Sequence, residues 1–206
     1  MHKLKRDIAP ACLARCAQEG RAWQNLSSAD TREIRSALET MQGSYCAYCE
    51  AVSDDKSKNQ NQRRHIEHFR PRAKFPELTY CWDNLFLSCS NSETCGKHKD
   101  KKGLGYSPDE VLNPCLDDPD RFLRFYANGR VDPARGISEA DKRRANETIR
   151  VFNLNAPSLV ERRKNVLCAW EWLKNSSSDK IKEYVSGILD QGQPFPTAVR
   201  HVLVGK

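Results

Sequence analysis

The sequence has no long apolar run, and this absence argues against an integral membrane protein. Of its 206 residues, 38% are hydrophobic and 30% are charged. No stretch approaches the roughly 20 apolar residues that a membrane helix needs. The N-terminal stretch MHKLKRDIAPACLARC also lacks the apolar core of a secretory signal. We therefore expect a cytoplasmic protein with no membrane partner.

Two further features are missing from the sequence. It contains no phosphate-binding P-loop motif, so we do not expect this chain to hydrolyse ATP, and it contains no internal repeat.

The chain is long enough for one compact domain, and it carries an excess of basic residues. The 34 Lys and Arg residues against 27 Asp and Glu give a net charge of +7. This excess favours a polyanionic partner, of which nucleic acid is the simplest.

The nine cysteines are unlike a disulfide framework, because their number is odd and the expected compartment is reducing. Cys46 and Cys49 form a Cys-x2-Cys knuckle, and Cys89 and Cys95 form a looser second pair. Four thiolates suit tetrahedral zinc in a closed structural site. Two alternatives remain: the second pair could be ordinary small residues, or the knuckle could be a redox pair, although no βαβ pattern surrounds it.

A second cysteine pattern, Cys12-x3-Cys16, has the spacing of one helical turn. Cysteines at this spacing more often pack in a core than bind a metal. We therefore predict packing roles for both residues.

The segment HIEHFRPR at 65–72 combines two of the five histidines with a carboxylate and two arginines. In an extended chain His65 and Glu67 point to one face and His68 to the other. Such a cluster can hold a divalent metal ion, supply a neutral imidazole as a base and pair arginine with phosphate. The alternative interpretation is a solvated polar loop. Further on, Asn84 in WDNL can hydrogen-bond the backbone across a loop and hold two halves of a site in register.

The remaining pattern predicts helices at both ends of the chain. Asp30 and Glu33 resemble a capping box for a helix over 31–42. In the C-terminal third, Ser138 is expected to cap one helix, and Ser158 with Glu161 a second. Apolar spacing predicts a third helix through 181–189 and a short last helix through 199–203.

Between these helical ends the chain is irregular. Residues 53–64 are polar and without periodicity, which predicts a flexible loop, and Asn128-Gly129 predicts a hairpin with a type I′ turn. We expect three regions: a helical N-terminal segment at 1–43, a zinc-stapled core at 44–135 and a helical C-terminal region at 136–206.

Taken in order, YCAYCE at 45–50, HIEHFRPR at 65–72, WDNLFLSC at 82–89 and VLNP at 111–114 resemble the HNH endonuclease superfamily. The similarity is closest to the PtuB-like HNH nucleases of Septu anti-phage systems, a group also found beside retrons. It covers roughly 45–131 by motif. The resemblance implies an α+β fold: a ββα-metal core with a four-cysteine zinc site, flanked by helical N-terminal and C-terminal segments.

The same resemblance implies roles for individual residues. His68 matches the general base, and Glu67 matches the acid that helps to hold a catalytic magnesium or manganese ion. His65 matches an upstream position that binds this metal or phosphate, and Asn84 matches the central asparagine of the HNH motif. The reaction would be metal-assisted phosphodiester hydrolysis.

The second knuckle departs from this family's pattern. Relatives usually carry Cys-x2-Cys-Asn-x2-Lys there, whereas this chain has CSNSETCGKHK. With Cys95 as the last thiol, Gly96 stands at the asparagine position and Lys99 at the lysine position. The last contact to the catalytic metal must then come from elsewhere, and we prefer His98 over Asn91.

The resemblance and the charge together imply the partners. Substrate nucleic acid, DNA or an RNA such as tRNA, would be bound along its backbone without reading sequence. The resemblance also implies a separate PtuA-like ATPase subunit, joined in retron versions by reverse transcriptase and msDNA. Three tryptophans in the helical ends could serve in docking or fill the core: Trp23, Trp170 and Trp172. The alternative function is a zinc-stapled nucleic-acid-binding adaptor without catalysis. The residues expected to contact the backbone are Arg70, Arg72, Lys97, Lys99, Lys101 and Lys102.

Overall fold

The computed structural model describes residues 1–53, 63–170, 173, 177–188 and 192–205. In chain order its helices and strands are α1 (Ala11–Gln18), α2 (Ser28–Gln42), β1 (Arg64–His68), β2 (Leu85–Cys89), α3 (Cys95–Lys99), β3 (Leu123–Phe125), β4 (Val131–Pro133), α4 (Glu139–Val151), α5 (Pro157–Ala169), α6 (Ser178–Ser186) and α7 (Pro196–Val204).

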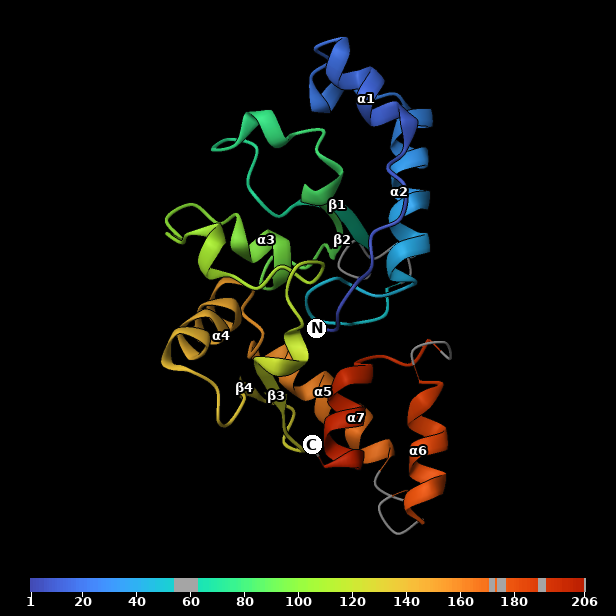
Figure 1. The fold of residues 1–206 in the computed structure, drawn as a ribbon, viewed down its shortest axis with the longest axis vertical. Helices are drawn as coiled ribbons and strands as arrows, with labels where there is room; N and C mark the ends of the chain where they lie inside the picture. The colour runs from blue at the N-terminus through green and yellow to red at the C-terminus, as the bar shows by residue number, and fades with distance from the viewer. Residues whose placement is uncertain (54–62, 171–172, 174–176, 189–191, 206) are drawn as a thin grey trace.

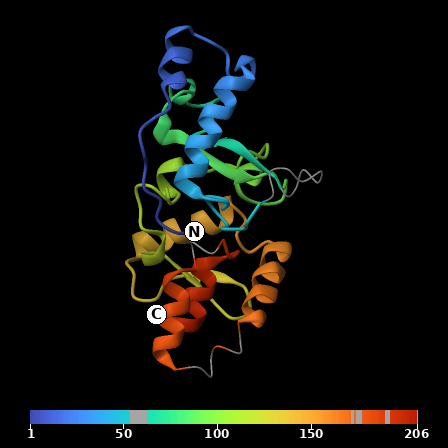
Figure 2. The ribbon, with the colours of Figure 1, turned by 90° about the vertical axis from the view of Figure 1, so that its right-hand side faces the viewer.

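The elements form an elongated molecule with three tiers (Figure 1). Helix α1 and the start of α2 lie at one end, β1, β2 and α3 occupy the middle, and α4–α7 with β3 and β4 form the other end. The view turned by 90° keeps this order and shows α2 running alongside the strands (Figure 2). Helices combined with small separate sheets confirm the α+β class. Within the described chain, no helix is both long and apolar enough to cross a membrane.

The middle tier is built on one antiparallel pair of strands. Strands β1 and β2 pair from Arg64 opposite Cys89 to His68 opposite Leu85. The first strand therefore carries the His-rich motif, and the second leads directly into the second cysteine pair. Helix α3 follows, so the order strand, strand, helix agrees with the order that the HNH resemblance implies.

Asn84 closes the long connection between these two strands. Its side-chain Oδ1 accepts the backbone N–H of Arg70 at 2.7 Å, and Nδ2 donates to the carbonyls of Arg70 and Leu78, both at 3.1 Å. The side chain is buried, so these bonds satisfy polar groups that cannot reach water. Asn84 thus holds the two ends of the loop in register, as its position in the sequence predicted.

Two hydrophobic clusters connect the tiers. The upper one joins α1 and α2 to β2 and consists of Cys12, Leu13, Ile34, Leu38, Trp82, Leu85 and Leu87. In the larger cluster, Tyr48 stacks on Phe152 with ring centroids 3.8 Å apart. This contact ties the Cys46 knuckle to the end of α4. Cys12 and Cys16 are both buried on α1, in agreement with packing roles.

Glu50 links the same knuckle to the C-terminal helices. Its backbone carbonyl accepts the N–H of Phe195 at 3.0 Å. Its carboxylate accepts the N–H of Thr197 at 3.1 Å and the Thr197 hydroxyl at 2.6 Å. Because Glu50 and Thr197 are both buried, the first turn of α7 is fixed to the segment that carries Cys46 and Cys49.

The helix caps differ from the predicted ones at two places. The α2 helix begins at Ser28, and Ser27 rather than Asp30 caps it, by accepting the backbone N–H of Asp30 at 3.0 Å. A serine one turn earlier thus takes the capping position, and Gly43 follows the helix. Ser138 caps α4 as predicted, by accepting the N–H of Asp141.

The second capping prediction is wrong as well. Helix α5 starts at Pro157, with Ala156 at the cap position and no side-chain cap, so Ser158 lies inside the helix. Proline at the first helical position has a suitable φ and no N–H to satisfy, which removes the need for a serine cap. The last predicted helix is present as α7.

The β3–β4 hairpin exists, but its turn is not type I′. Gly129 has a φ of +82°, while Asn128 is not among the positive-φ residues, and a type I′ turn needs both. Tyr126 accepts the N–H of Gly129 and donates to Arg130, each at about 3 Å. This is the longer hairpin loop that ends in a left-handed glycine.

Some predictions lie outside the described residues. They concern most of the polar loop at 53–64, Trp172 and the end of the 181–189 helix. The other two candidate docking tryptophans are described: Trp23 is partly buried against the upper cluster, and Trp170 packs edge-on against Tyr184. The boundaries of the three proposed regions stay a prediction.

Candidate active site

The four cysteines predicted to form one site lie together. The sulfur atoms of Cys46, Cys49, Cys89 and Cys95 are all within 4.8 Å of one another, and all four residues are buried. Four thiols so close, with no disulfide between them, have the donor set and spacing of a tetrahedral zinc site. The predicted cluster is confirmed as a group that can hold a metal ion.

Backbone groups orient these sulfur atoms. The Sγ of Cys46 accepts the N–H of Cys89 at 3.3 Å, and the Sγ of Cys49 accepts the N–H of Ala51 at 3.5 Å. Burial works against a Cys46 thiolate, but hydrogen bonds from Cys49, Cys89 and Cys95 bring the pKa of Cys46 well below its ordinary value. The pocket therefore favours one charged sulfur already, which is the form that binds a metal.

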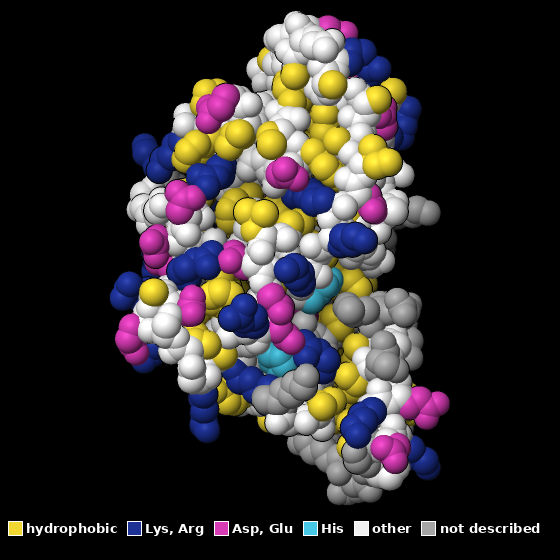
Figure 3. Space-filling view, viewed as in Figure 1, with side chains coloured by type: hydrophobic (Ala, Val, Ile, Leu, Met, Phe, Trp, Pro, Cys, Tyr) yellow, Lys and Arg dark blue, Asp and Glu magenta, His cyan; other side chains and the backbone are white. Residues whose placement is uncertain are grey.

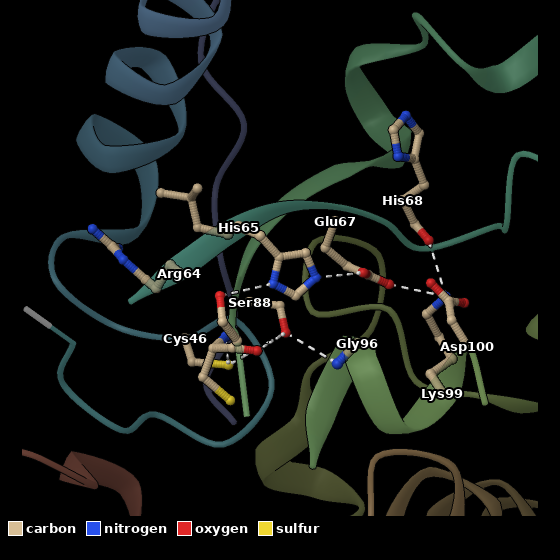
Figure 4. A network of polar contacts seen from close by, with 12 residues as sticks. Cys46, Arg64, His65, Glu67, His68, Ser88, Gly96, Lys99 and Asp100 are labelled. Carbon is tan, nitrogen blue, oxygen red and sulfur yellow. Dashed lines mark hydrogen bonds and ion pairs between the residues drawn. The ribbon is translucent and has the colours of Figure 1, made fainter. Parts of the chain in front are cut away.

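Ser88 on β2 connects the cysteine cluster to α3 (Figure 4). Its hydroxyl oxygen accepts the backbone N–H of Gly96 at 3.0 Å and lies 3.9 Å from the Cys46 sulfur. The first turn of α3 is thus held from both sides, by Cys95 in the cluster and by Ser88 on the strand. Because Cys95 belongs to the cysteine cluster and begins α3, the position of the cluster also sets the position of the helix.

Glu67 is the centre of the second cluster. Its carboxylate is 2% exposed and lies 3.2 Å from Nε2 of His65 and 2.9 Å from Nζ of Lys99. Burial alone would raise the pKa of this carboxyl, but the His65 hydrogen bond and the Lys99 charge bring it below its ordinary value. The predicted shared face of His65 and Glu67 is therefore present, and Glu67 is ionised.

Gly96 makes room for this carboxylate. A Cβ added at Gly96 would lie 2.3 Å from Oε2 of Glu67, which is far inside a van der Waals contact. The absence of a side chain at Gly96 thus leaves the space that the Glu67 carboxylate occupies.

Lys99 is buried rather than displayed to solvent. Besides Glu67, its ammonium donates to the backbone carbonyl of His68 at 3.1 Å and to the carboxylate of Asp100. Burial would lower the pKa of Lys99, but Glu67 and Asp100 raise it above its ordinary value. The ammonium therefore lies between two carboxylates, one buried and one on the surface.

His68 lies on the other side of the strand, and Figure 4 shows its imidazole pointing away from His65 and Glu67. Its Nε2 is 3.0 Å from the carbonyl oxygen of Thr79, and the indole of Trp23 lies edge-on with ring centroids 4.4 Å apart. Burial lowers the pKa of His68 to about 4. The imidazole is neutral at pH 7, and a carbonyl can only accept, so the proton is on Nε2 and the lone pair is on Nδ1.

A cleft of about 850 Å³ joins these groups. His65, Glu67 and His68 line it although their side chains leave the strand on different sides. Lys and Arg side chains stand among acidic ones over this region of the surface, around α3 and the loop after it (Figure 3). The cationic residues that line the cleft are Arg72, Lys74, Lys97, Lys99, Lys101 and Lys102.

Several predicted site residues are placed elsewhere. Nδ1 of His98 lies 2.9 Å from the carbonyl oxygen of Val151 on α4, and Asn91 accepts the N–H of Glu93 at 2.8 Å. Neither of the two candidate metal contacts lines the cleft. Arg70 also lies outside it and pairs with Asp109.

Sequence reasoning missed other residues of the cleft. Asp100 follows Gly96 by four positions, and helical spacing could have placed both on one face of α3. Trp23 and Thr79 are far from the His-rich motif in sequence, and no local pattern signals their contacts with His68. Lys74 is one more cation beyond those predicted.

One further group of donors exists in the described residues, formed by Cys12, Asp30 and Glu33. Asp30 is already paired with Arg15 and Arg21, and Glu33 accepts the backbone N–H of Cys12. Burial raises the pKa of Cys12 to about 12, which disfavours the thiolate that a metal needs. These contacts fix α1 against α2.

Comparison with known proteins identifies relatives of this chain. The protein named Septu protein PtuB of Bacillus mycoides is 26% identical over 207 aligned residues, which cover 81% of this chain and 67% of the relative. Septu protein PtuB of Bacillus thuringiensis is 32% identical over 94 residues, covering 45% of this chain and 33% of the relative. Retron Vc95 putative HNH endonuclease of Vibrio cholerae is 26% identical over 141 residues, covering 65% and 63%.

No family model matches the chain. Its alignments span about two thirds of the length of two of these relatives and a third of the other. At this modest identity, the chain is related to PtuB and to an HNH-type nuclease, as the motifs indicated.

Proposed function

We propose that this relative of Septu PtuB is a metal-dependent HNH endonuclease that hydrolyses phosphodiester bonds in nucleic acid as the effector of an anti-phage defence complex. The observation that carries the proposal is the state of His68. A neutral imidazole, with its proton committed to the Thr79 carbonyl, lines the same basic cleft as the buried Glu67. That combination suits a general base beside a phosphate-binding surface.

In the proposed reaction, Nδ1 of His68 takes a proton from water as the water oxygen bonds to phosphorus. The bond from phosphorus to the leaving 3′-oxygen breaks, and that oxygen leaves with the electron pair. The Nε2–H bond to Thr79 stabilises the imidazolium that forms, because a carbonyl accepts well from a cation. Burial keeps the base unprotonated at neutral pH.

The catalytic magnesium or manganese belongs to the same proposal. Hard oxygen donors suit such an ion, and the carboxylates of Glu67 and Asp100 both lie within reach of one cation, the Lys99 ammonium. When bound, the ion would polarise the phosphate and stabilise the leaving oxygen. Glu67 and His65 are the proposed ligands, and Asp100 is better placed than His98 or Asn91 to complete the set.

Lys99 has a clear consequence for this metal site. In the described residues, the groups of three or more close donors are the four cysteines and the Cys12 group, and neither includes Glu67. Because Lys99 already neutralises Glu67, the ion must displace the ammonium from one carboxylate. We therefore propose that the Lys99 ammonium balances the charges of the Glu67 and Asp100 carboxylates. It would not bind the nucleic acid backbone.

Zinc is the proposed occupant of the four-cysteine cluster. It would take no part in the reaction, and its four thiolates would hold the Cys46 knuckle, β2 and α3 together. Arg72, Lys97, Lys101 and Lys102 then line a cleft whose positive charge suits phosphate contacts that do not read sequence. The substrate is DNA or an RNA such as tRNA, since hydrolysis by this site needs no 2′-hydroxyl.

The proposed partners come from the family resemblance of the motifs, and the Septu and retron names of the relatives support them. A PtuA-like ATPase subunit is the expected partner of a PtuB-like chain, and the Retron Vc95 relative suggests retron reverse transcriptase and msDNA as further ones. The helical segment at 1–43 is proposed to take part in docking. Co-expression with a tagged PtuA-like subunit tests this, and recovery of this chain alone beside a soluble ATPase would contradict it.

His68→Ala is the central test of the nuclease proposal. It should abolish cleavage of tRNA and plasmid DNA while zinc content and the melting temperature stay near those of the parent. His98→Ala is the matched control, because His98 contacts α4 and does not line the cleft. Undiminished cleavage by His68→Ala would reject the nuclease mechanism.

The adaptor without catalysis remains a second candidate, and the Lys99–Glu67 ion pair favours it because it occupies the carboxylate that a metal needs. Titration of zinc-loaded protein with Mn²⁺ distinguishes the two. A nuclease should bind about one Mn²⁺ and lose it in Glu67→Gln. An adaptor should bind nucleic acid without any such ion.

A further inference from the structure

Trp23 covers the imidazole of His68. It lies in a short 3₁₀ turn (Trp23–Asn25) between α1 and α2, far before His68 in the chain. The two rings meet edge-on at 79° with centroids 4.4 Å apart, and both side chains line the cleft. A segment predicted to serve for docking therefore builds one wall of the candidate active site.

Trp23 is itself held firmly by its surroundings. The hydroxyl of Tyr80 donates to the carbonyl of Arg21 at 2.5 Å, and the Arg21 guanidinium lies 2.9 Å from the Asp30 carboxylate. The Tyr80 ring also packs against the indole, with centroids 5.7 Å apart. Tyr80 follows Thr79, whose carbonyl accepts the proton of His68, so one loop fixes both the indole and the hydrogen-bond acceptor.

We propose that Trp23 is a positioning residue for His68, holding the imidazole in the one orientation in which Nε2 donates to Thr79 and Nδ1 keeps the lone pair. The catalytic consequence of this inference rests on the proposed nuclease function. The positioning itself does not, because it is a property of the folded chain.

The physical reason lies in the torsion of histidine. The bond to its ring has broad, roughly two-fold minima, so the ring can turn by 180°. This turn exchanges Nε2 with the carbon Cε1 and Nδ1 with the carbon Cδ2, and it would take the Nε2 proton away from the Thr79 carbonyl. The hydrogen bond to Thr79 favours the arrangement in which Nε2 faces the carbonyl and leaves Nδ1 free to accept a proton. The indole packs against the ring in this orientation, with centroids 4.4 Å apart. In the described residues, no hydrogen bond to Nδ1 competes with the Nε2 contact to Thr79.

A different role for Trp23 is stacking on a nucleobase. The guanidinium of Arg72 already lies over the indole, 5.6 Å from its centroid, and the imidazole of His68 packs against the same ring at 79°. A face covered in this way is poorly suited to a base. The structure therefore favours positioning, and stacking becomes an outcome that the experiment can detect.

The decisive measurement is the tautomer of His68 in zinc-loaded protein carrying ¹⁵N-labelled histidine. The chain has five histidines, and loss of one signal set in His68→Gln identifies the resonances. The parent should show a single neutral form with the proton on Nε2. Trp23→Ala should show a mixture of both tautomers, and Trp23→Phe should retain the single form.

Trp170→Ala is the control, because Trp170 packs on Tyr184 in the C-terminal region. It should leave the His68 signals unchanged. A single Nε2–H form in folded Trp23→Ala would overturn the proposal.

Kinetics give the second readout. Misplacing a reacting group by about 1 Å can cost about 100-fold in rate, so Trp23→Ala should lower kcat by about 10- to 100-fold on the nucleic acid that the parent cuts. Its Kd for that labelled nucleic acid should change less than about twofold, since binding contacts remain. Weaker binding with unchanged kcat and tautomer would identify a stacking residue and reject positioning.

These outcomes separate the two proposals. If His68→Ala still cuts, the nuclease mechanism fails, while the tautomer result still decides the role of Trp23. If His68→Ala is inactive but Trp23→Ala has the parent's kcat, the nuclease proposal stands and the positioning inference fails.

Discussion

The four-cysteine cluster and the Glu67 cluster both draw residues from the β1–β2 pair and α3, the former together with the turn at Cys46 and Cys49. They are organised in opposite ways. In the first, four like donors converge, all buried and all within 4.8 Å. In the second, unlike groups already neutralise each other, since Glu67 is paired with both His65 and Lys99. The first arrangement has four donors that could hold a metal ion, whereas in the second the carboxylate of Glu67 already has cationic partners.

This difference has a physical basis. A structural site contributes most to stability when its ligands have no other stable arrangement. A catalytic site must bind and release its ligands. Ion pairs between its own side chains keep such a site stable when no ligand is bound. The predictions below test whether the two clusters separate into these roles.

Breaking the cysteine cluster should have the largest effect. Cys46→Ser removes one thiolate and should abolish the binding of about one zinc ion per chain, with a fall in melting temperature of about 10 °C or more, because metal binding here is folding free energy. Elemental analysis and thermal unfolding measure both. Cys168→Ser, at an exposed cysteine, is the control and should match the parent; soluble, folded parent protein without zinc would contradict the site.

Removing the base should leave the fold intact and affect only the cleft. His68→Ala is expected to lose about 10²–10⁴-fold in the rate of cleavage, with zinc content unchanged. Gel assays on tRNA and plasmid DNA, beside calorimetric unfolding, separate the two effects. A variant that loses zinc together with activity would show that the two clusters are not independent.

A methyl group at Gly96 should disturb the junction between the clusters. Alanine normally favours a helix over glycine, but here its Cβ would lie 2.3 Å from the Glu67 carboxylate. Gly96→Ala should therefore destabilise the protein by about 1–3 kcal/mol, as overpacking does. Gly105→Ala is matched to it, since its Cβ would meet nothing within 4 Å; equal melting temperatures for both variants would contradict the packing of Glu67.

The smallest effect concerns acid stability, away from both clusters. Burial opposes the charge of Asp120, but His201 and Arg200 hold the pKa of this carboxyl below its ordinary value. Its contribution to stability is thus complete above the unfolded-state pKa and is lost as pH falls through the lower folded-state pKa. Asp120→Asn should narrow the stability difference between pH 7 and pH 3, measured by urea unfolding.

The local features were predictable from the sequence, and the long-range ones were not. Spacing alone located the cysteine knuckles, the His65–Glu67 face and the loop-closing role of Asn84, because each depends on a strand or a short turn. Two long-range contacts were not predictable: Trp23 with His68, and Lys99 with Glu67. Both depend on how α1 and α3 pack, which no local pattern encodes. The caps at Ser27 and Ala156 were misassigned because several neighbouring residues could serve, and tertiary packing selects among them.

Glu50 bears on how this chain can be divided. The sequence suggests a core that ends near residue 135, yet Glu50, the residue after the Cys46 knuckle, receives hydrogen bonds from Phe195 and Thr197. Its carboxylate also pairs with the Met1 ammonium and with His2. A fragment cut at that boundary would leave a buried carboxylate without the Thr197 donors, which is costly. The first turn of α7 therefore supplies donors to the residue that follows the cysteine knuckle, and a fragment intended to keep this contact should include α7.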